Sequence, residues 1–255
     1  MKPPRRSPLS LVLPVLLLAA AAGARAAADE PACGAPPELL EAGAPLPATS
    51  RAVSAGSLRI LVVGSASVLG PGTSGPAAAW PARLEALLAA RHPGLKVETA
   101  VRGGPGLTAA DGVAMIKEEL RRNPAQLVLW QTGAVETARN LDVDELAAAL
   151  DNGLTRTNLA GADAVLVDQQ FSRFLRANAN VEAYREAMRL AAAAHNAPLF
   201  RRYELMQAWA DADKVDMERA PRSARVSVTD RLNDCLAQAM ALLLEDGMEA
   251  SKPRP

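Results

Sequence analysis

The stretch LRILVVGSASVLG, residues 58–70, joins a nearly continuous apolar run to a glycine-rich turn. Such a run is typical of a strand buried on both faces, as the strands of a parallel sheet are. Four further segments have strand character, and two of them, at 126–131 and 163–168, are again nearly continuously apolar. The five predicted strands are LRILVV (58–63), KVETAV (96–101), QLVLWQ (126–131), DAVLVD (163–168) and APLFRR (197–202).

Helical patterns alternate with these strands. Apolar residues from Trp80 to Leu88 recur at the spacing of one helix face, and TAAD at 108–111 is a capping-box pattern that begins a second helix. Further helices are predicted within VDELAAALDNGL, EAYREAMRLAAAAH and DRLNDCLAQAMALLL. The alternation predicts a three-layer α/β/α sandwich around a parallel five-stranded sheet. Ligands of such sheets bind beyond the carboxyl ends of the strands, so the loops that follow the strands are the candidate site.

The N-terminus differs in composition from the rest. A basic opening precedes the apolar run LSLVLPVLLLAAAAG, and Ala24-Arg25-Ala26 matches a small-x-small cleavage site. We interpret residues 1–26 as a secretory signal peptide, which predicts an exported, periplasmic or extracellular protein with no stable membrane span after cleavage. An uncleaved membrane anchor is the alternative. After residue 26 we expect a Pro/Ala-rich arm at 27–57, the sandwich domain at 58–247 and a disordered tail at 248–255.

Charge and cysteine content limit the classes of partner. Loss of residues 1–26 would leave 24 basic and 28 acidic residues, and this net charge of −4 argues against a nucleic-acid partner. In an oxidising compartment, Cys33 and Cys235 are expected to form a disulfide between the arm and a C-terminal helix, the alternative being two unrelated buried thiols. Two distant cysteines and two isolated histidines have no ligand spacing, so we expect no metal site and no cofactor.

Four loops at the predicted strand ends carry a resemblance to a known family. They are contained in LRILVVGSAS (58–67), RGGPG (102–106), LVLWQTGAVE (127–136) and VTDRLND (228–234). In this order they resemble the SGNH or GDSL-type hydrolases over roughly residues 58–244. The resemblance implies a flavodoxin-like sandwich and hydrolysis of esters, commonly acyl groups on carbohydrates or lipids. Family members use a serine nucleophile, a glycine N–H and an asparagine that hold the oxyanion, and a D-x-x-H pair whose histidine is the base.

The residues at these motif positions depart from the family pattern. Gly104 and Asp230 match, but Ala66 stands at the nucleophile position, Val135 at the oxyanion asparagine and Asn233 at the base. A methyl group cannot attack a carbonyl carbon. Valine offers no side-chain donor, a loss that costs an active hydrolase on the order of 100-fold. An amide does not act as a base near neutral pH. The sequence therefore predicts a catalytically inactive relative.

Other residues of the chain could replace the nucleophile and the base of the family pattern. Ser65 or Ser67 would supply a hydroxyl if the turn were shifted by one residue, with His92 or His195 as base. Both histidines are predicted at helix C-termini, where an imidazole interacts favourably with the helix dipole, so we interpret them as structural. The carboxylates Glu136, Asp168 and Asp230 are interpreted as helix caps and solvated loop residues, the alternative being an acid–base pair or a divalent-cation site.

The functional hypothesis is a ligand-binding cleft without hydrolytic chemistry. The ligand expected from the resemblance is an acylated saccharide, a lipid, a cell-envelope component or a partner protein. Two alternatives remain: an active ester hydrolase or acyl transferase that uses Ser65 or Ser67, and a scaffold whose cleft is vestigial. The predicted cleft consists of Gly64, Ser65, Ser67, Gly103, Gly104, Gln131, Thr132, Gly133, Glu136, Asp168, Gln169, Asp230 and Asn233.

Overall fold

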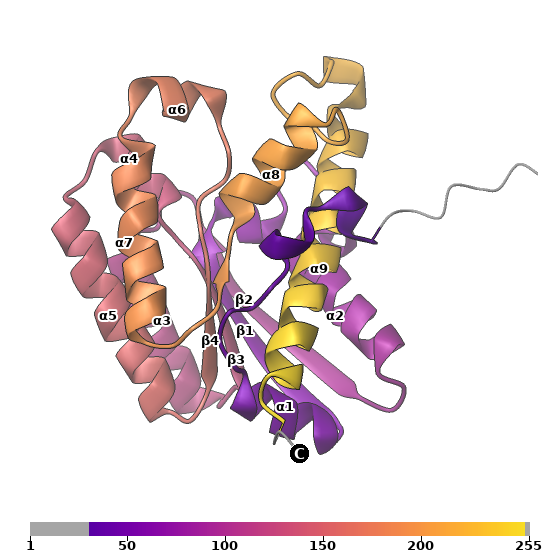
Figure 1. The fold of residues 1–255 in the computed structure, drawn as a ribbon, viewed down its shortest axis with the longest axis vertical. Coiled ribbons are helices and arrows are strands. Elements are labelled where there is room, and N and C mark those ends of the chain that lie inside the picture. The colour runs from indigo at the N-terminus through magenta and orange to yellow at the C-terminus, as the bar shows by residue number, and fades with distance from the viewer. Residues whose placement is uncertain (1–30, 253–255) are drawn as a thin grey trace, which may run out of the picture.

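Five strands form one all-parallel sheet in the order β2-β1-β3-β4-β5, with helices on both of its faces (Figure 1). The computed structural model describes residues 31–252, so the expected signal peptide at 1–26 lies outside the described residues. The strands are β1 (Ser57–Ser65), β2 (Lys96–Gly104), β3 (Leu127–Gln131), β4 (Asp163–Val167) and β5 (Leu199–Phe200). The predicted three-layer α/β/α sandwich with a parallel five-stranded sheet is confirmed.

The helices separate into two layers. Helices α3, α5 and α7 cover one face of the sheet, and α1, α2, α8 and α9 cover the other (Figure 1). The helices are α1 (Pro47–Ser54), α2 (Trp80–Arg91), α3 (Ala109–Arg122), α4 (Ala134–Arg139), α5 (Val143–Leu159), α6 (Arg173–Asn178), α7 (Val181–Ala194), α8 (Arg202–Asp211) and α9 (Arg225–Glu249). Single 3-10 turns are η1 (Pro31–Gly34), η2 (Pro37–Leu39), η3 (Ala66–Leu69), η4 (Pro76–Ala78) and η5 (Arg222–Ala224).

The continuous apolar character of the central strands is explained by this double burial. Along β1, Ile60 and Val62 pack with the α2 and α9 layer, whereas Leu61 and Val63 pack with the α3, α5 and α7 layer. Successive side chains of a strand point to opposite faces, so both sets must be apolar when both faces are covered. The predicted capping box is also present, because Thr108 and Asp111 exchange hydrogen bonds at the start of α3.

Four expected boundaries differ from the structure. The segment APLFRR forms a strand only at Leu199–Phe200, and Arg202 already begins α8. The expected RGGPG turn starts late, because β2 continues through Gly104 in register with Ser65 of β1. The arm contains α1, which the sequence pattern does not reveal. The expected tail overlaps α9, since the helix runs to Glu249 and the Ser251 hydroxyl still donates to the Gly247 carbonyl.

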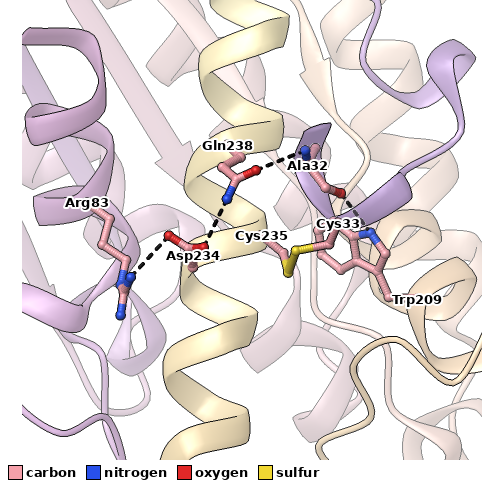
Figure 2. Close-up of a disulfide and its surroundings, with 7 residues drawn as sticks. All are labelled: Ala32, Cys33, Arg83, Trp209, Asp234, Cys235 and Gln238. Carbon is pink, nitrogen blue, oxygen red and sulfur yellow. Dashed lines mark hydrogen bonds and ion pairs between the residues drawn. A yellow bond between two sulfur atoms is a disulfide. The ribbon is translucent and has the colours of Figure 1, made fainter. Parts of the chain in front are cut away.

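A disulfide between Cys33 and Cys235 attaches the arm to α9, as predicted (Figure 2). Hydrogen bonds flank the bridge on both sides. The Ala32 N–H donates to Gln238 Oε1 at 3.0 Å, and Trp209 Nε1 donates to the Ala32 carbonyl at 3.1 Å. The bridge therefore lies within a bonded contact between three segments that are far apart in the sequence, namely the arm, α8 and α9.

Candidate functional site

The candidate site lies where the sheet order reverses. β1 lies between β2 and β3 in the sheet. The chain leaves β1 toward β2 on one side and leaves β3 toward β4 on the other, so the two connections diverge and leave a crevice at the carboxyl ends of the strands. Ser65 ends β1 and Gln131 ends β3. Gln131 Nε2 donates to Ser67 Oγ at 2.6 Å and to Ser65 Oγ at 3.2 Å. The structure thus brings three of the predicted cleft residues together.

Ala66 begins the 3-10 turn η3 at this edge. The next apolar residue, Val68, is buried and covers the ends of β1 and β2. A Cβ atom at Gly103 would lie 2.4 Å from Val68 Cγ2, and one at Gly64 would lie 2.8 Å from Val68 Cγ1. Gly64 and Gly103, both expected in the cleft, are therefore required for the packing of Val68 instead of offering open backbone to a ligand.

The loop after β3 is held by a carboxylate. Glu136 Oε2 accepts a hydrogen bond from the Gly133 N–H at 3.1 Å, and Glu136 Oε1 accepts one from the Ala109 N–H at 2.5 Å. Gly133 has a φ of 89°, in the left-handed region that favours glycine. Val135 follows in the first turn of α4 and adds no hydrogen-bond donor from its side chain. Glu136 is thus a helix cap for α3 and α4, in agreement with the structural interpretation.

The two motif positions near the C-terminus lie inside α9 and bind the segment that precedes α2. Asp230 Oδ1 accepts from the Ser74 N–H at 2.9 Å, and the hydrogen bonds with Ser74 lower the pKa of Asp230. Asn233 Oδ1 accepts from the Trp80 N–H at 2.9 Å, while its Nδ2 donates to the Thr229 carbonyl at 2.9 Å. Both ends of the Asn233 amide are therefore engaged, and the residue caps the N-terminus of α2 from a neighbouring helix.

Neither histidine of the chain belongs to this edge. His92 follows α2 and its Nε2 lies 3.9 Å from Glu245 Oε1, whereas His195 follows α7 with its Nε2 2.8 Å from Asp151 Oδ1. Helices α2 and α7 end just before β2 and β5 begin. Their C-termini consequently lie at the amino ends of the strands, opposite the candidate site. The interpretation of both histidines as structural agrees with these positions.

Asp168, directly after β4, belongs to a buried charged cluster. It accepts from the Tyr203 N–H at 2.9 Å and lies 3.6 Å from Arg185 Nε, and Arg185 also forms an ion pair with Glu204. Burial raises the pKa of Asp168 to about 7 and repulsion from Glu204 adds to the rise, while the Tyr203 N–H, Arg185 and Arg202 oppose it. The first role of Asp168 is thus to cap α8.

The remaining polar residues of the predicted cleft differ in their hydrogen bonding. Gln169 Oε1 accepts from Thr137 Oγ1 at 2.6 Å, and Gln169 Nε2 donates to the Val181 carbonyl at 3.3 Å. This amide connects α4 to the start of α7 and is fully used. Thr132 Oγ1 and Gln131 Oε1, in contrast, are buried and have no hydrogen-bond partner within residues 31–252. Buried polar atoms without a hydrogen-bond partner are uncommon in proteins. The hydrogen-bonding capacity of the side chains at this edge is therefore incompletely used.

A cavity of about 200 Å³ opens at the same edge. Of the predicted cleft residues, Ser67 and Asn233 line it, together with Gln170 from the loop after β4. The sequence pattern did not identify Arg202, because that residue was placed at the end of a strand. The lining residues are Ser67, Gly70, Pro71, Gln170, Phe171, Ser172, Arg202, Met206, Met217, Glu218, Thr229, Leu232, Asn233 and Leu236.

The cavity contains one buried cation. Arg202 is 4% exposed, and its Nη1 donates to Ser67 Oγ at 3.3 Å. Burial lowers the pKa of Arg202 to about 10, with Asp168 opposing the decrease, so the guanidinium is still charged at neutral pH. Within the described part of the chain, no three His, Cys, Asp or Glu side chains gather as metal ligands would. The arrangement therefore offers hydroxyl, amide, carboxylate and guanidinium groups beside apolar side chains.

Comparisons with known proteins agree with this architecture. A model of the non-GDSL lipase-like family matches residues 32–250. The crystal structure of TesA is 18% identical, with a TM-score of 0.55 over 69% of this chain and 94% of that one. AlinE4, an SGNH-hydrolase family esterase, is 23% identical, with a TM-score of 0.53 over 67% of this chain and 89% of that one.

A third similar structure is a two-domain esterase, CEX, that is active on acetylated mannans and was co-crystallised with mannopentaose. It is 14% identical, with a TM-score of 0.65 over 83% of this chain and 56% of that one. At these identities the structures establish the fold alone. No curated protein sequence matches the chain. The resemblance to SGNH hydrolases that the four loops predicted is confirmed.

Proposed function

Because the chain belongs to the non-GDSL lipase-like family, we propose that it is an exported protein that binds a ligand in an SGNH-type cleft without hydrolysing it. The observation that carries this proposal is the environment of the two remaining hydroxyls. Ser65 and Ser67 receive hydrogen bonds from Gln131, and Ser67 receives a second from Arg202. Neither an amide N–H nor a guanidinium removes a proton from a serine, so the hydroxyls lack the base that nucleophilic attack needs.

Substitute bases are poorly placed for the alternative, an active hydrolase or acyl transferase with a rearranged site. Both histidines lie at the amino ends of the strands, away from the hydroxyls. Asp168 has a pKa of about 7, which suits a general base, but it is buried, accepts from the Tyr203 N–H and is absent from the cavity lining. Asn233 occupies the motif position of the base and caps α2. A proton path from Ser67 would require rearrangement of these contacts.

The proposed ligand is an acylated saccharide or another acyl-bearing component of the cell envelope. Activity on acetylated mannans belongs to the similar esterase CEX and is the source of this inference. The cavity supports it through its size and walls, since about 200 Å³ between Phe171, Met206 and Leu236 suits a small acyl group. The hydroxyl of Ser67 lies in the same cavity and would orient the ligand.

Export is part of the proposal. A disulfide joins Cys33 to Cys235, and such bridges persist in oxidising compartments outside the cytoplasm. The proposed signal peptide at 1–26 provides the route. Within residues 31–252, no helix combines the length and the apolar character that crossing a membrane requires.

The test is hydrolysis of short-chain aryl esters by the protein purified without residues 1–26. We expect no turnover above that of buffer and no labelling by a serine-directed phosphonate, because no carboxylate or imidazole within residues 31–252 is hydrogen-bonded to Ser65 or Ser67. Ala66→Ser alone is expected to remain inactive, since it restores a hydroxyl but neither the base nor the oxyanion asparagine. Turnover or labelling that Ser65→Ala or Ser67→Ala abolishes would establish the active alternative instead.

Binding is measured separately by calorimetry. We expect acetylated mannooligosaccharides to bind more tightly than the same saccharides after chemical deacetylation, because only the former place an acyl group in the cavity. Equal affinity for the two preparations would show that the protein does not recognise the acyl group. No binding of either would leave a scaffold with a vestigial cleft as the better description.

A further inference from the structure

The guanidinium of Arg202 lacks the partner that a buried cation normally has. Arg202 is 4% exposed, its Nε is buried without a hydrogen-bond partner, and its side chain donates one hydrogen bond within residues 31–252, from Nη1 to Ser67 Oγ at 3.3 Å. Within residues 31–252 it forms no ion pair; Asp168 interacts with it only at longer range. Buried charges in proteins are normally paired, because removing an ion from water is costly.

The carboxylates around Arg202 are already engaged elsewhere. Arg185 binds both Glu204 and Asp168. Glu218, which also lines the cavity, accepts from the Ser172 hydroxyl at 2.9 Å and from the backbone and side chain of Arg173. The cavity therefore contains a cation on its inner wall whose charge no adjacent anion of the described chain neutralises in direct contact.

The hydroxyl of Ser67 adds a second donor beside this cation. Its Oγ accepts from Gln131 Nε2 at 2.6 Å and from Arg202 Nη1 at 3.3 Å. A serine oxygen with two lone pairs occupied in this way has only its O–H left to offer. Ser67 and Arg202, which both line the cavity, can therefore donate to the same acceptor.

Five of the residues that line the cavity have large apolar side chains. They come from the loop after β4, from α8, from the loop before α9 and from α9 itself. The apolar lining residues are Phe171, Met206, Met217, Leu232 and Leu236. A ligand that satisfies both parts of the cavity has an anionic group at one end and a short hydrocarbon body at the other. A planar carboxylate fits the fork of a guanidinium better than a neutral carbonyl does.

We propose that this cavity binds a monocarboxylate with a short apolar chain, with its carboxylate on Arg202 and Ser67 and its chain against the methionine and leucine side chains. The inference rests on the proposed absence of hydrolysis, and it adds a free carboxylic acid to the acyl esters proposed above as ligands of the cavity. An acyl ester satisfies the apolar lining residues, whereas a free acid also pairs with the buried cation.

Proton linkage provides a signature that a merely structural arginine would lack. The pKa of Asp168 is raised to about 7 by burial and by Glu204, and is held down by the Tyr203 N–H, Arg185 and Arg202. A ligand carboxylate beside Arg202 competes for the guanidinium and so favours the protonated form of Asp168. Binding at neutral pH is therefore accompanied by proton uptake, and the affinity rises as the pH falls from about 8 to about 6.

The experiment is calorimetric titration of the protein without residues 1–26 with sodium hexanoate, in two buffers that differ in ionisation enthalpy. 1-Hexanol and hexylammonium serve as neutral and cationic probes of the same chain length. We expect hexanoate to bind at least about 10-fold more tightly than either, with proton uptake near pH 7. Equal binding of hexanol and hexanoate would overturn the proposal, because the cavity would then recognise only the alkyl chain.

Variants assign the effect to residues. Arg202→Gln is expected to lower hexanoate affinity at least about 10-fold, and Arg201→Gln, the neighbouring arginine outside the cavity lining, to change it less than about twofold. Unchanged affinity in a folded Arg202→Gln protein would refute the assignment. If that variant fails to fold, Ser67→Ala decides, since a loss of about threefold or more is expected and an unchanged affinity contradicts the proposal.

The outcomes separate this inference from the proposed function. Ester turnover by the unmodified protein would end the proposal of a non-hydrolytic cleft, and the dependence of hexanoate affinity on Arg202 would still be measurable. An inactive protein that binds no hexanoate would refute the carboxylate site alone.

Discussion

The contact between the arm and α9 and the carboxyl edge of the sheet are both buried, but they differ in how completely their polar groups are bonded. In the first, the Leu46 N–H donates to the Gly247 carbonyl and to Ser251 Oγ. About three helical turns earlier in α9, Cys235 forms the disulfide with Cys33 (Figure 2). At the carboxyl edge, polar atoms are left over. Of the seven buried side-chain atoms without a partner in residues 31–252, five belong to Gln131, Thr132, Arg185, Arg202 and Glu204.

This difference agrees with a stabilising role of the contact between the arm and α9 and with the proposed binding role of the carboxyl edge. An unsatisfied buried polar group costs about 1–3 kcal/mol relative to a bonded one, so a fold without a ligand gains nothing from keeping five of them together. The arm contributes stability through satisfied contacts. Of the five residues with such atoms at the carboxyl edge, Arg202 lines the cavity, where the proposed ligand would pair with it.

The largest expected effect concerns the arm. Replacing Cys33 and Cys235 by serine is expected to lower the free energy of unfolding by about 4 to 5 kcal/mol, because the bridge closes a loop of 202 residues in the unfolded chain. Denaturant unfolding of the double variant measures this loss of unfolding free energy. Reduction of the unmodified protein is the matched control and should give a similar loss. An unchanged midpoint would mean that the bridge adds nothing to the hydrogen-bonded contact.

A second substitution tests the packing of the arm. Leu46 is fully buried and packs against Gly247, where an added Cβ would lie 2.8 Å from its side chain. We expect Leu46→Ala to cost about 2–5 kcal/mol, since the backbone of the arm is bonded and cannot collapse into the cavity. Leu159→Ala removes an exposed leucine and is expected to cost less than about 0.5 kcal/mol. Similar losses of unfolding free energy in the two variants would contradict a stabilising role for the packing of the arm against α9.

A third stability effect belongs to the carboxyl edge and appears as a dependence on pH. The raised pKa of Asp168, about 7, means that the folded protein holds a proton that the unfolded chain releases near pH 4. Its contribution to stability therefore falls as the pH rises from about 4 to about 7, by at most about 1.4 kcal/mol per pH unit. Asp168→Asn keeps an acceptor for the Tyr203 N–H and should flatten this slope. Asp144→Asn, which removes an exposed carboxylate on α5, should leave the slope unchanged.

Two of the helices that the sequence pattern missed, α1 and α8, share one physical cause. Helix α1 receives its cap from Asp163, whose carboxylate accepts from the N–H groups of Ala48 and Thr49 at 3.2 and 2.7 Å. Helix α8 receives its cap from Asp168 through Tyr203. Both aspartates flank β4 and are distant from these helices in the sequence. A helix whose first turn is satisfied from elsewhere needs no local capping residue, so no local signal reveals it.

The same reasoning applies to the candidate site. The motif positions Ala66, Val135 and Asn233 were identified in the sequence, because strand-end loops follow local patterns and the side chains at those positions are chemically limited. The contacts that these residues form were not predicted from the sequence. That Asn233 caps α2 and that Ser67 lies beside Arg202 depends on the docking of α8 and α9 against the β1 edge. Arg202 itself was missed because its segment was interpreted as a strand.

The sequence by itself predicted the sheet, its parallel arrangement, the alanine at the motif position of the nucleophile and the disulfide between the two cysteines. Each of these follows from local periodicity, from the chemistry of a single side chain or from the absence of any other thiol. Tertiary structure alone decided which carboxylates cap helices, which way the histidines lie and that a buried arginine faces a cavity. These depend on the distances between segments that are remote in the chain, and such distances are set by packing.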